Sequence, residues 1–191
     1  MKNNIMTGIF ESDREIKDYI IQASLNPEHI KSNNRGERYL SYRKLTTIIG
    51  VTCYIIFNNK ILILERVPSV NFGGGKWGTV SGYVDSLEIV HTSNQILRDH
   101  IIKEIQEEIG WDLDDRMTLS YCSNHSFIEP QVKIHLELFT LFISQTPPDI
   151  KLNTEHLSYK WIELAKIKSL KEITVAQFIE GLEKCNLLIP G

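Results

Sequence analysis

The sequence has few of the features that mark membrane proteins, disulfide-rich proteins or nucleic-acid coats. Its 191 residues include three cysteines, an odd number spread too far apart for a zinc motif or a disulfide framework. No apolar run approaches the roughly 18–20 residues that span a bilayer, and the N-terminus lacks a signal-peptide pattern. The formal net charge of −3 argues against a polybasic surface for nucleic acid or lipid. We therefore expect a cytoplasmic protein with no membrane or nucleic-acid partner.

What is present is the composition of an ordinary folded domain, with 42% hydrophobic and 24% charged residues. A chain of this length can form one domain with a sizeable core and an appendage. We divide it into an N-terminal extension, residues 1–45, and a main domain, residues 46–191. In the extension, Ser12 and Glu15 have capping-box spacing, and the apolar repeat that follows predicts one amphipathic helix and then a loop. This helix would pack on the main domain or form a homodimer contact.

The main domain alternates predicted strands with predicted helices. Two β-branched runs flank Asn58 and Asn59, and this pattern predicts a hairpin with a two-residue turn. The expected strands are residues 46–57, 61–64, 77–84, 119–127, 132–143 and 159–162, the fourth and fifth joined around Glu129 and Pro130. Helices are expected after Asn94 and over residues 175–187. Mixed strands with interspersed helices predict an α/β fold in which one sheet is covered on both faces.

Three glutamates near the end of the first of these helices are the most informative residues of the chain: Glu104, Glu107 and Glu108, called here the glutamate trio. Positions three and four apart share a helix face, and the neighbouring arc of this helix is apolar. Gly110 suits the left-handed residue that ends a helix. The trio therefore crowds the negative end of the helix dipole, which costs roughly 0.3–1 kcal/mol per charge.

A cation would reverse this penalty. Clustered oxygen ligands without a nearby cysteine favour a hard ion, Mg²⁺ or Mn²⁺. The alternative interpretation is a solvated acidic helix face. His100 lies one turn earlier on the same side, and we interpret it as a surface histidine.

The glutamate trio belongs to a longer pattern that resembles the box of the Nudix (MutT-like) hydrolases, G-x5-E-x7-R-E-U-x-E-E-x-G-U, where U is a bulky apolar residue. Gly82 and Glu88 match the first two fixed letters. The later matches are Glu104, Ile105, Glu107, Glu108, Gly110 and Trp111. The resemblance implies a Nudix-type α/β/α sandwich with a mixed sheet, to which the N-terminal helical extension is added.

The sequence departs from the box in two places. Lys103 stands where the family has arginine, and fourteen residues, 89–102, separate Glu88 from Lys103 where the pattern has seven. We expect this seven-residue insertion to lengthen the loop around residues 89–94. Lysine cannot form arginine's planar bidentate pair with a carboxylate, so we do not expect the usual tie to Glu88 in that form. Gln95 could replace it by hydrogen bonding.

A second resemblance lies downstream. Residues 155–161 read E-H-L-S-Y-K-W and are similar to a segment of Nudix enzymes that act on dinucleoside polyphosphates and on nucleoside or pterin triphosphates. By this resemblance Glu155 is a further metal ligand or the general base. We interpret His156 as a loop residue that packs or hydrogen bonds.

Together the resemblances imply Mg²⁺-dependent hydrolysis of a phosphoanhydride bond in a nucleoside diphosphate linked to another moiety. The implied metal ligands are the glutamate trio and the Gly82 carbonyl, and the general base is Glu107 or Glu155. A bound ion neutralises phosphate oxygens and acidifies a bound water, whose proton a nearby carboxylate can take. Arg66 and Lys76 are candidates for holding phosphate. The candidates for stacking on a base or ring are Tyr83, Tyr159, Phe72 and Phe127.

Two other functions compete with this one. The insertion and Lys103 are consistent with a non-catalytic nucleotide-binding or regulatory domain that keeps the Nudix fold, although the intact glutamate trio argues against it. An isopentenyl diphosphate isomerase shares the fold, but its cysteine and glutamate context is absent around Cys53 and Cys122.

Overall fold

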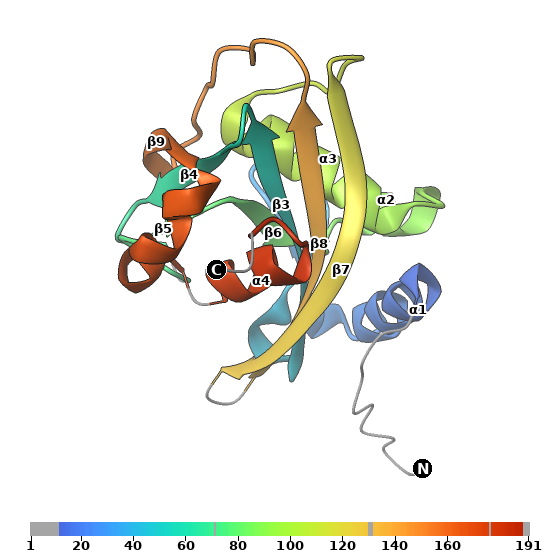
Figure 1. Cartoon of the computed structure of the whole chain (residues 1–191). Coiled ribbons are helices and arrows are strands. Elements are labelled where there is room, and N and C mark those ends of the chain that lie inside the picture. Colours follow the sequence, from blue (N-terminus) through green and yellow to red (C-terminus); the bar gives the residue numbers. More distant parts are fainter. Residues whose placement is uncertain (1–11, 71, 130–131, 176, 189–191) are drawn as a thin grey trace.

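A mixed β-sheet forms the centre of the molecule, with helices on both of its faces (Figure 1). The computed structural model describes residues 12–70, 72–129, 132–175 and 177–188. The elements are α1 (Asp13–Ser24), η1 (Pro27–His29), β1 (Ile30–Ser32), β2 (Arg38–Leu40), η2 (Tyr42–Lys44), β3 (Thr47–Phe57), β4 (Lys60–Arg66), β5 (Trp77–Gly78), β6 (Val80–Tyr83), α2 (Leu87–Thr92), α3 (Ile96–Ile109), β7 (Met117–Glu129), β8 (Val132–Ile143), β9 (His156–Glu163), η3 (Leu164–Ile173) and α4 (Phe178–Lys184).

Strand β3 is the central strand, because it pairs on both of its edges. One edge runs parallel to β8 along its whole length. The other edge is shared: β6 pairs antiparallel with residues 50–53 in the middle of β3, and β4 pairs antiparallel with its end. The β3–β4 turn consists of Asn58 and Asn59, with φ of 48° and 59°. Asparagine tolerates this left-handed conformation, so the predicted hairpin is confirmed.

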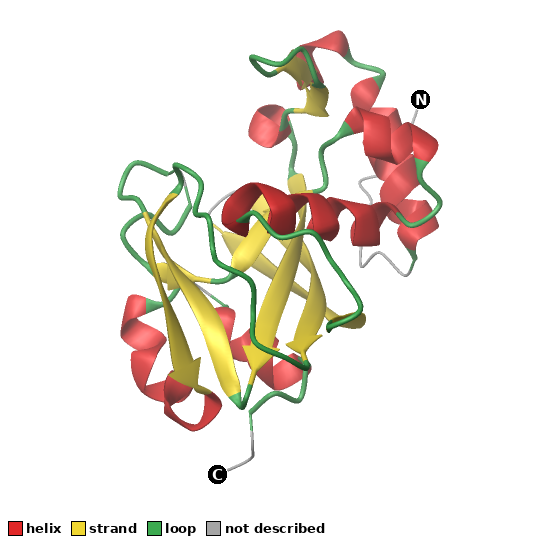
Figure 2. Cartoon of the chain, turned by 90° about the horizontal axis from the view of Figure 1, so that it is seen from above, coloured by secondary structure: helices red, strands yellow, loops and turns green. Residues whose placement is uncertain are grey.

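The two faces of the sheet carry separate apolar cores. Residues of β3 alternate between them, with Val51 and Ile55 in one core and Tyr54 and Ile56 in the other, as the period of two along a strand requires. The first core packs against α1, α2 and α3, and the second against α4 and η3 (Figures 1 and 2). The predicted α/β/α sandwich with a mixed sheet is therefore confirmed.

The N-terminal segment contains more structure than the predicted helix and loop. Helix α1 begins after Ser12, whose Oγ accepts a hydrogen bond from the Glu15 amide at 3.4 Å, and its residues Ile16 and Ile20 are fully buried in the first core. The prediction of a plain loop after it was wrong, because β1 and β2 form an antiparallel hairpin. The backbone N–H of Leu40 donates to the Asp85 carbonyl at 2.9 Å, which attaches this hairpin to the segment after β6.

Two further predictions were wrong in the region that leads into α3. The expected single strand over residues 77–84 is two strands, because β5 pairs with β4 whereas β6 pairs with β3. The expected loop at residues 89–94 is largely helix α2, which Ser86 caps and which buries Leu87 and Val90.

At the C-terminal side, α4 is shorter than the predicted helix and β9 is longer than the predicted strand. The predicted turn at Pro130 lies outside the described residues. No helix in the described part of the chain has the length and apolar composition needed to cross a membrane.

Candidate active site

Helix α3 packs across β6, and this packing fixes the position of two members of the glutamate trio. Gly82 of β6 lies against the Glu104 carboxylate so closely that a Cβ at position 82 would overlap it. One residue earlier, the Ser81 backbone N–H donates to Oε1 of Glu108 at 3.4 Å. Gly110 ends α3 in the left-handed conformation with φ of 74°, as predicted. The predicted helix end and its acidic last turn therefore lie against the strand that carries Gly82.

A cavity of about 630 Å³ opens beside these residues. Its charged lining includes Asp85, Lys103, Glu104 and Glu107. Apolar and aromatic side chains from β7, β8 and α4 supply another part of the lining: Phe127, Ile134, Leu136 and Phe178. This combination suits a cation beside the carboxyl groups and an aromatic or apolar group against the other part of the lining.

Burial changes the protonation of the acidic groups. It raises the pKa of Glu104 to about 8, and the neighbouring Glu108 charge raises it further. Burial likewise raises the pKa of Glu108 to about 8, against the opposing charge of Arg66. The pKa of Asp85 rises to about 7 for the same reason, partly offset by Lys103. A cation bound here would displace protons that these carboxyl groups otherwise hold at neutral pH.

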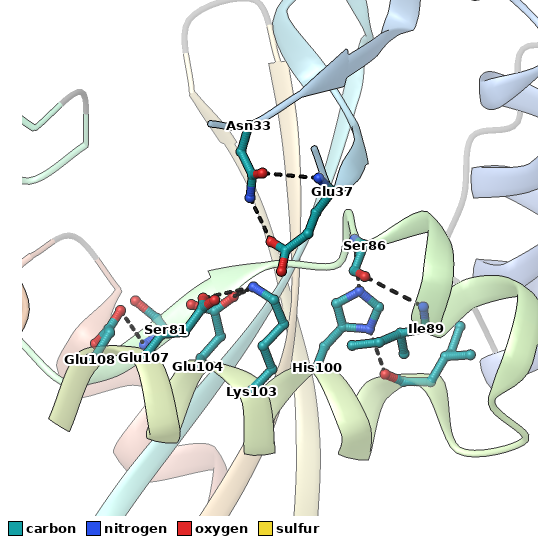
Figure 3. Close-up of polar contacts among 11 residues, drawn as sticks. Asn33, Glu37, Ser81, Ser86, Ile89, His100, Lys103, Glu104, Glu107 and Glu108 are labelled. Atoms are coloured by element: carbon teal, nitrogen blue, oxygen red, sulfur yellow. Dashed lines mark hydrogen bonds and ion pairs between the residues drawn. The ribbon is translucent and has the colours of Figure 1, made fainter. Parts of the chain in front are cut away.

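Lys103 lies among the glutamates (Figure 3). Its Nζ is 2.7 Å from Oε2 of Glu107 and 4.0 Å from Oε1 of Glu104. Burial disfavours its charge, but the hydrogen bond to Glu107 and the attraction of Glu104 outweigh burial and raise the pKa of Lys103. Within the described ranges, neither Lys103 nor Gln95 contacts the exposed Glu88 carboxylate through a hydrogen bond or ion pair.

Glu108 faces a buried histidine. Nε2 of His156 lies 3.1 Å from Oε2 of Glu108, but the contact lacks hydrogen-bond alignment, and among the described residues neither atom has a hydrogen-bond partner. Burial lowers the pKa of His156 to about 4, and the positive charge of Arg66 lowers it further. His156 is therefore neutral, and Oε2 of Glu108 is buried beside it without a hydrogen-bond partner among the described residues.

These features fit a hard divalent cation. The donors are carboxylate oxygens, one of them buried without a hydrogen-bond partner among the described residues. Burial raises the pKa of Glu104 and of Glu108, so their negative charges are poorly solvated there. In the described part of the chain, no three His, Cys, Asp or Glu side chains converge on a single point. Mg²⁺ commonly keeps several waters and takes one or two carboxylates, so a partly hydrated ion suits this arrangement.

The structure brings only some of the predicted substrate-binding residues to the cavity. Arg66, Tyr83 and Glu155 line it, as do the aromatic candidates Phe72 and Phe127. Nη2 of Arg66 lies 3.9 Å from Oε2 of Glu155. The exposed residues Lys76 and Tyr159 are not among the described residues that line this cavity.

Sequence reasoning also missed residues of the site and misplaced one. Asp85 and Gln177 line the cavity, and Gln177 has an unusual φ of 65° and shares a 2.8 Å hydrogen bond with His125. No local sequence signal identifies either residue. The prediction of a surface position for His100 was wrong, because its side chain is fully buried under the segment that carries Ser86.

Comparisons with known proteins identify the fold. No protein-family model and no curated protein matches the sequence. Among solved structures, the MutT protein from Methanosarcina mazei Go1 is similar with 24% identity and a TM-score of 0.59, over 75% of this chain and 95% of that chain. The dihydroneopterin triphosphate pyrophosphohydrolase of E. coli has 21% identity and a TM-score of 0.52, over 73% of this chain and 93% of that chain.

A solved structure that covers more of this chain is that of a bifunctional NMN adenylyltransferase/ADP ribose pyrophosphatase from Francisella tularensis, complexed with AMP and a Mn ion. It has 19% identity and a TM-score of 0.54, over 88% of this chain and 47% of that chain. The chain therefore has the fold of the Nudix hydrolases, and the fold expected from the box resemblance is confirmed.

Proposed function

We propose that the protein is a Nudix pyrophosphohydrolase that cleaves a phosphoanhydride bond in a nucleoside diphosphate linked to another moiety. The observation that carries this proposal is a buried carboxylate oxygen of Glu108 that has no hydrogen-bond partner among the described residues. It belongs to the same acidic last turn of α3 as Glu104 and Glu107, which line the cavity. The pyrophosphohydrolase from E. coli and the Francisella tularensis protein with AMP and a Mn ion support it through the shared fold.

The glutamate trio and the Gly82 carbonyl would hold Mg²⁺ or Mn²⁺. The bound ion would neutralise phosphate oxygens and make a bound water more acidic. Glu107 or Glu155 takes the proton of the attacking water, since both border the cavity and both are partly exposed. Lys103, 2.7 Å from Glu107, orients that carboxylate.

The remaining residues hold the substrate. Arg66 carries a largely buried guanidinium group beside the acidic residues, and guanidinium matches the geometry of phosphate oxygens. Tyr83 is 46% exposed and contacts Tyr42 in a tilted arrangement with ring centroids 5.6 Å apart, so part of its ring is accessible for stacking. We assign the nucleoside to the aromatic part of the cavity and the diphosphate to the part near α3.

A substrate panel with Mg²⁺ tests this proposal. Nucleotide-sugars, dinucleoside polyphosphates and nucleoside triphosphates are incubated with the wild type, Glu107→Gln, Glu155→Gln and the control Glu172→Gln, an exposed residue outside the described cavity lining. We expect turnover of at least one class. Whichever of Glu107→Gln and Glu155→Gln removes the general base should turn over at least about 100-fold more slowly than the wild type. The control Glu172→Gln should be unchanged. Turnover of no member of the panel would overturn the proposal.

A non-catalytic nucleotide-binding domain is the second candidate function. The observation that favours it is the 2.7 Å ion pair of Lys103 with Glu107. In this ion pair a lysine of the protein itself, and not a metal ion, neutralises one glutamate of the trio. Calorimetry on the same panel separates the two functions, because this candidate requires nucleotide binding with no product formed.

A further inference from the structure

A second cavity, of about 890 Å³, lies on the side of the N-terminal hairpin. The hairpin contributes Asn33, Arg35, Glu37, Arg38 and Tyr39, and the opposite side includes Glu88 and Gln106. Three residues line both cavities: Asp85, Lys103 and Glu107. The proposed reaction centre therefore lies between two cavities, and residues 33–39 of the N-terminal hairpin form one side of the second cavity.

Backbone and side-chain hydrogen bonds hold the hairpin in place. Oδ1 of Asn33 accepts from the backbone N–H groups of Arg35 and Glu37, at 2.9 and 3.0 Å. Nδ2 of Asn33 donates to the Glu37 carboxylate at 2.6 Å, and Figure 3 shows Glu37 pointing from the hairpin toward α3. Tyr39 forms an isolated antiparallel β-bridge with Ser86, next to the hydrogen bond between Leu40 and Asp85. The hairpin is thus fixed against the segment that carries Asp85.

Two cations in this cavity have no acidic partner among the described residues. Asn33, which is uncharged, hydrogen bonds to the Glu37 carboxylate, and Lys103 pairs with Glu107. Glu88, on the opposite side, forms no ion pair with a described residue. Arg35 and Arg38 are exposed, line the cavity and form no ion pair with any described residue. Guanidinium groups bind phosphate oxygens bidentately, and these two groups are available to do so.

The two cavities differ in what they can bind. The first has aromatic and apolar surfaces from Phe127 and Phe178, which suit a nucleoside, whereas the second is lined almost entirely by polar and charged side chains. A substrate that is cleaved beside Glu107, with its nucleoside in the first cavity, extends its other group past Lys103 into the second.

We propose that Arg35 and Arg38 bind additional phosphate on the group beyond the scissile bond, so that the enzyme prefers substrates whose departing part carries more than one phosphate. This inference rests on the proposed function. It gives the N-terminal extension, whose Ile16 and Ile20 are buried in the first core, a role in substrate selection as well.

The test compares two substrates that share one base, a nucleoside tetraphosphate and a nucleoside diphosphate-glucose. In the double variant Arg35→Ala/Arg38→Ala we expect kcat/KM to fall at least tenfold on the tetraphosphate and less than twofold on the glucose compound. Arg35→Lys/Arg38→Lys should restore part of the loss, because it keeps the charges but not the bidentate geometry. Arg43→Ala is the matched control, since Arg43 is exposed in η2 and is not among the described residues lining either cavity. An equal loss on both substrates, or no loss on either, overturns the inference.

A binding measurement separates this inference from the proposed function. Inorganic tripolyphosphate is titrated by calorimetry into the wild type, the double alanine variant and Arg43→Ala, with thermal unfolding as a check on folding. We expect Kd to rise at least tenfold in the double variant alone. If the panel shows no turnover but this difference is present, the hydrolase proposal fails and the anion site stands; if Kd is the same in all three, the anion site fails.

Discussion

Gly82 and Glu104 fill complementary space: the Glu104 carboxylate occupies the volume that a Cβ at position 82 would need. Gly82 is thus required for close approach of α3 to β6, and it requires no left-handed backbone. This contact explains physically why a glycine on a strand and a glutamate on a helix, 22 positions apart in the chain (104 minus 82), belong to one motif.

Replacing Gly82 by alanine should therefore displace the Glu104 carboxylate. We expect turnover to slow by at least about 100-fold and the free energy of unfolding to decrease by about 1–3 kcal/mol, the usual cost of overpacking. Glu104→Asp shortens the side chain by one methylene and makes room for a Cβ at position 82. The losses of activity and stability in Gly82→Ala/Glu104→Asp should therefore be smaller than the sum of the losses in the two single variants. Steady-state kinetics and urea unfolding of all four proteins measure this coupling, and strictly additive effects would contradict it.

Metal binding should depend on pH through the two buried carboxyl groups. Glu104 and Glu108 have pKa values raised to about 8, and an ion must displace their protons. The affinity for Mg²⁺ should therefore increase as the pH rises from 6 to about 8 and then level off. At a free Mg²⁺ concentration of 100 times Kd, binding of the ion should add about 2.7 kcal/mol to the free energy of unfolding.

The metal-free protein should show the opposite trend. A carboxyl group whose pKa is raised in the folded state stabilises that state most below its unfolded pKa, and this contribution is lost as the pH rises toward about 8. Thermal unfolding with EDTA and with 10 mM Mg²⁺, from pH 6 to pH 9, tests both trends on the wild type and on Glu104→Gln/Glu108→Gln. Identical pH profiles with and without the ion would count against the assignment of these two ligands.

His100 should make the folded protein sensitive to acid. Its Nδ1–H donates to the Ile96 carbonyl at 2.7 Å, and its Nε2 accepts from the Ser86 N–H at 3.1 Å, a pattern that only the neutral ring allows. Burial lowers the pKa of His100 to about 4. The unfolded chain binds a proton below about 6.5, so stability should fall by about 3 kcal/mol as the pH drops from 6.5 to 4.

Urea unfolding at pH 7.5, 6, 5 and 4 measures this slope. His100→Gln should weaken it, although the variant is also less stable at pH 7.5 because it cannot keep both hydrogen bonds. His29→Gln is the control, since His29 is only half-buried in the N-terminal segment. An unchanged slope in His100→Gln would assign the acid sensitivity to other groups, such as His156.

The sequence predicted the parts of the fold and site that depend on local chemistry. The Asn58–Asn59 turn, the Gly110 helix end and the shared face of the glutamate trio each follow from neighbours within a few residues. Helix α2 was missed because its residues were interpreted through the box spacing as an extended loop, although Ser86, Leu87 and Val90 carry the cap and apolar spacing of a helix.

The rest of the site depends on contacts between distant segments. The burial of His100 follows from packing of the Ser86 segment, and the position of Arg35 and Arg38 follows from the hydrogen bond between Leu40 and Asp85. Neither contact has a periodicity that a single sequence reveals. The cavity lining by Gln177 likewise depends on how α4 covers the second face of the sheet.

Lys103 provides the final prediction, because it replaces the arginine of the resembled box and pairs with Glu107 instead of Glu88. Its Nζ lies 2.7 Å from Oε2 of Glu107, and at 31% exposure its side chain is partly buried. Lys103→Met removes the charge but keeps most of the length, so Glu107 loses its orienting partner. We expect turnover to slow about tenfold, which corresponds to about 1.4 kcal/mol of transition-state stabilisation.

Lys103→Arg is the matched variant, since it keeps the charge and changes only the geometry. It should retain more activity than Lys103→Met, and Glu107→Gln combined with Lys103→Met should be no worse than Glu107→Gln alone. Steady-state kinetics across the four proteins tests this dependence. A further loss in the double variant would show that Lys103 acts independently of Glu107, for example by contacting the substrate phosphate directly.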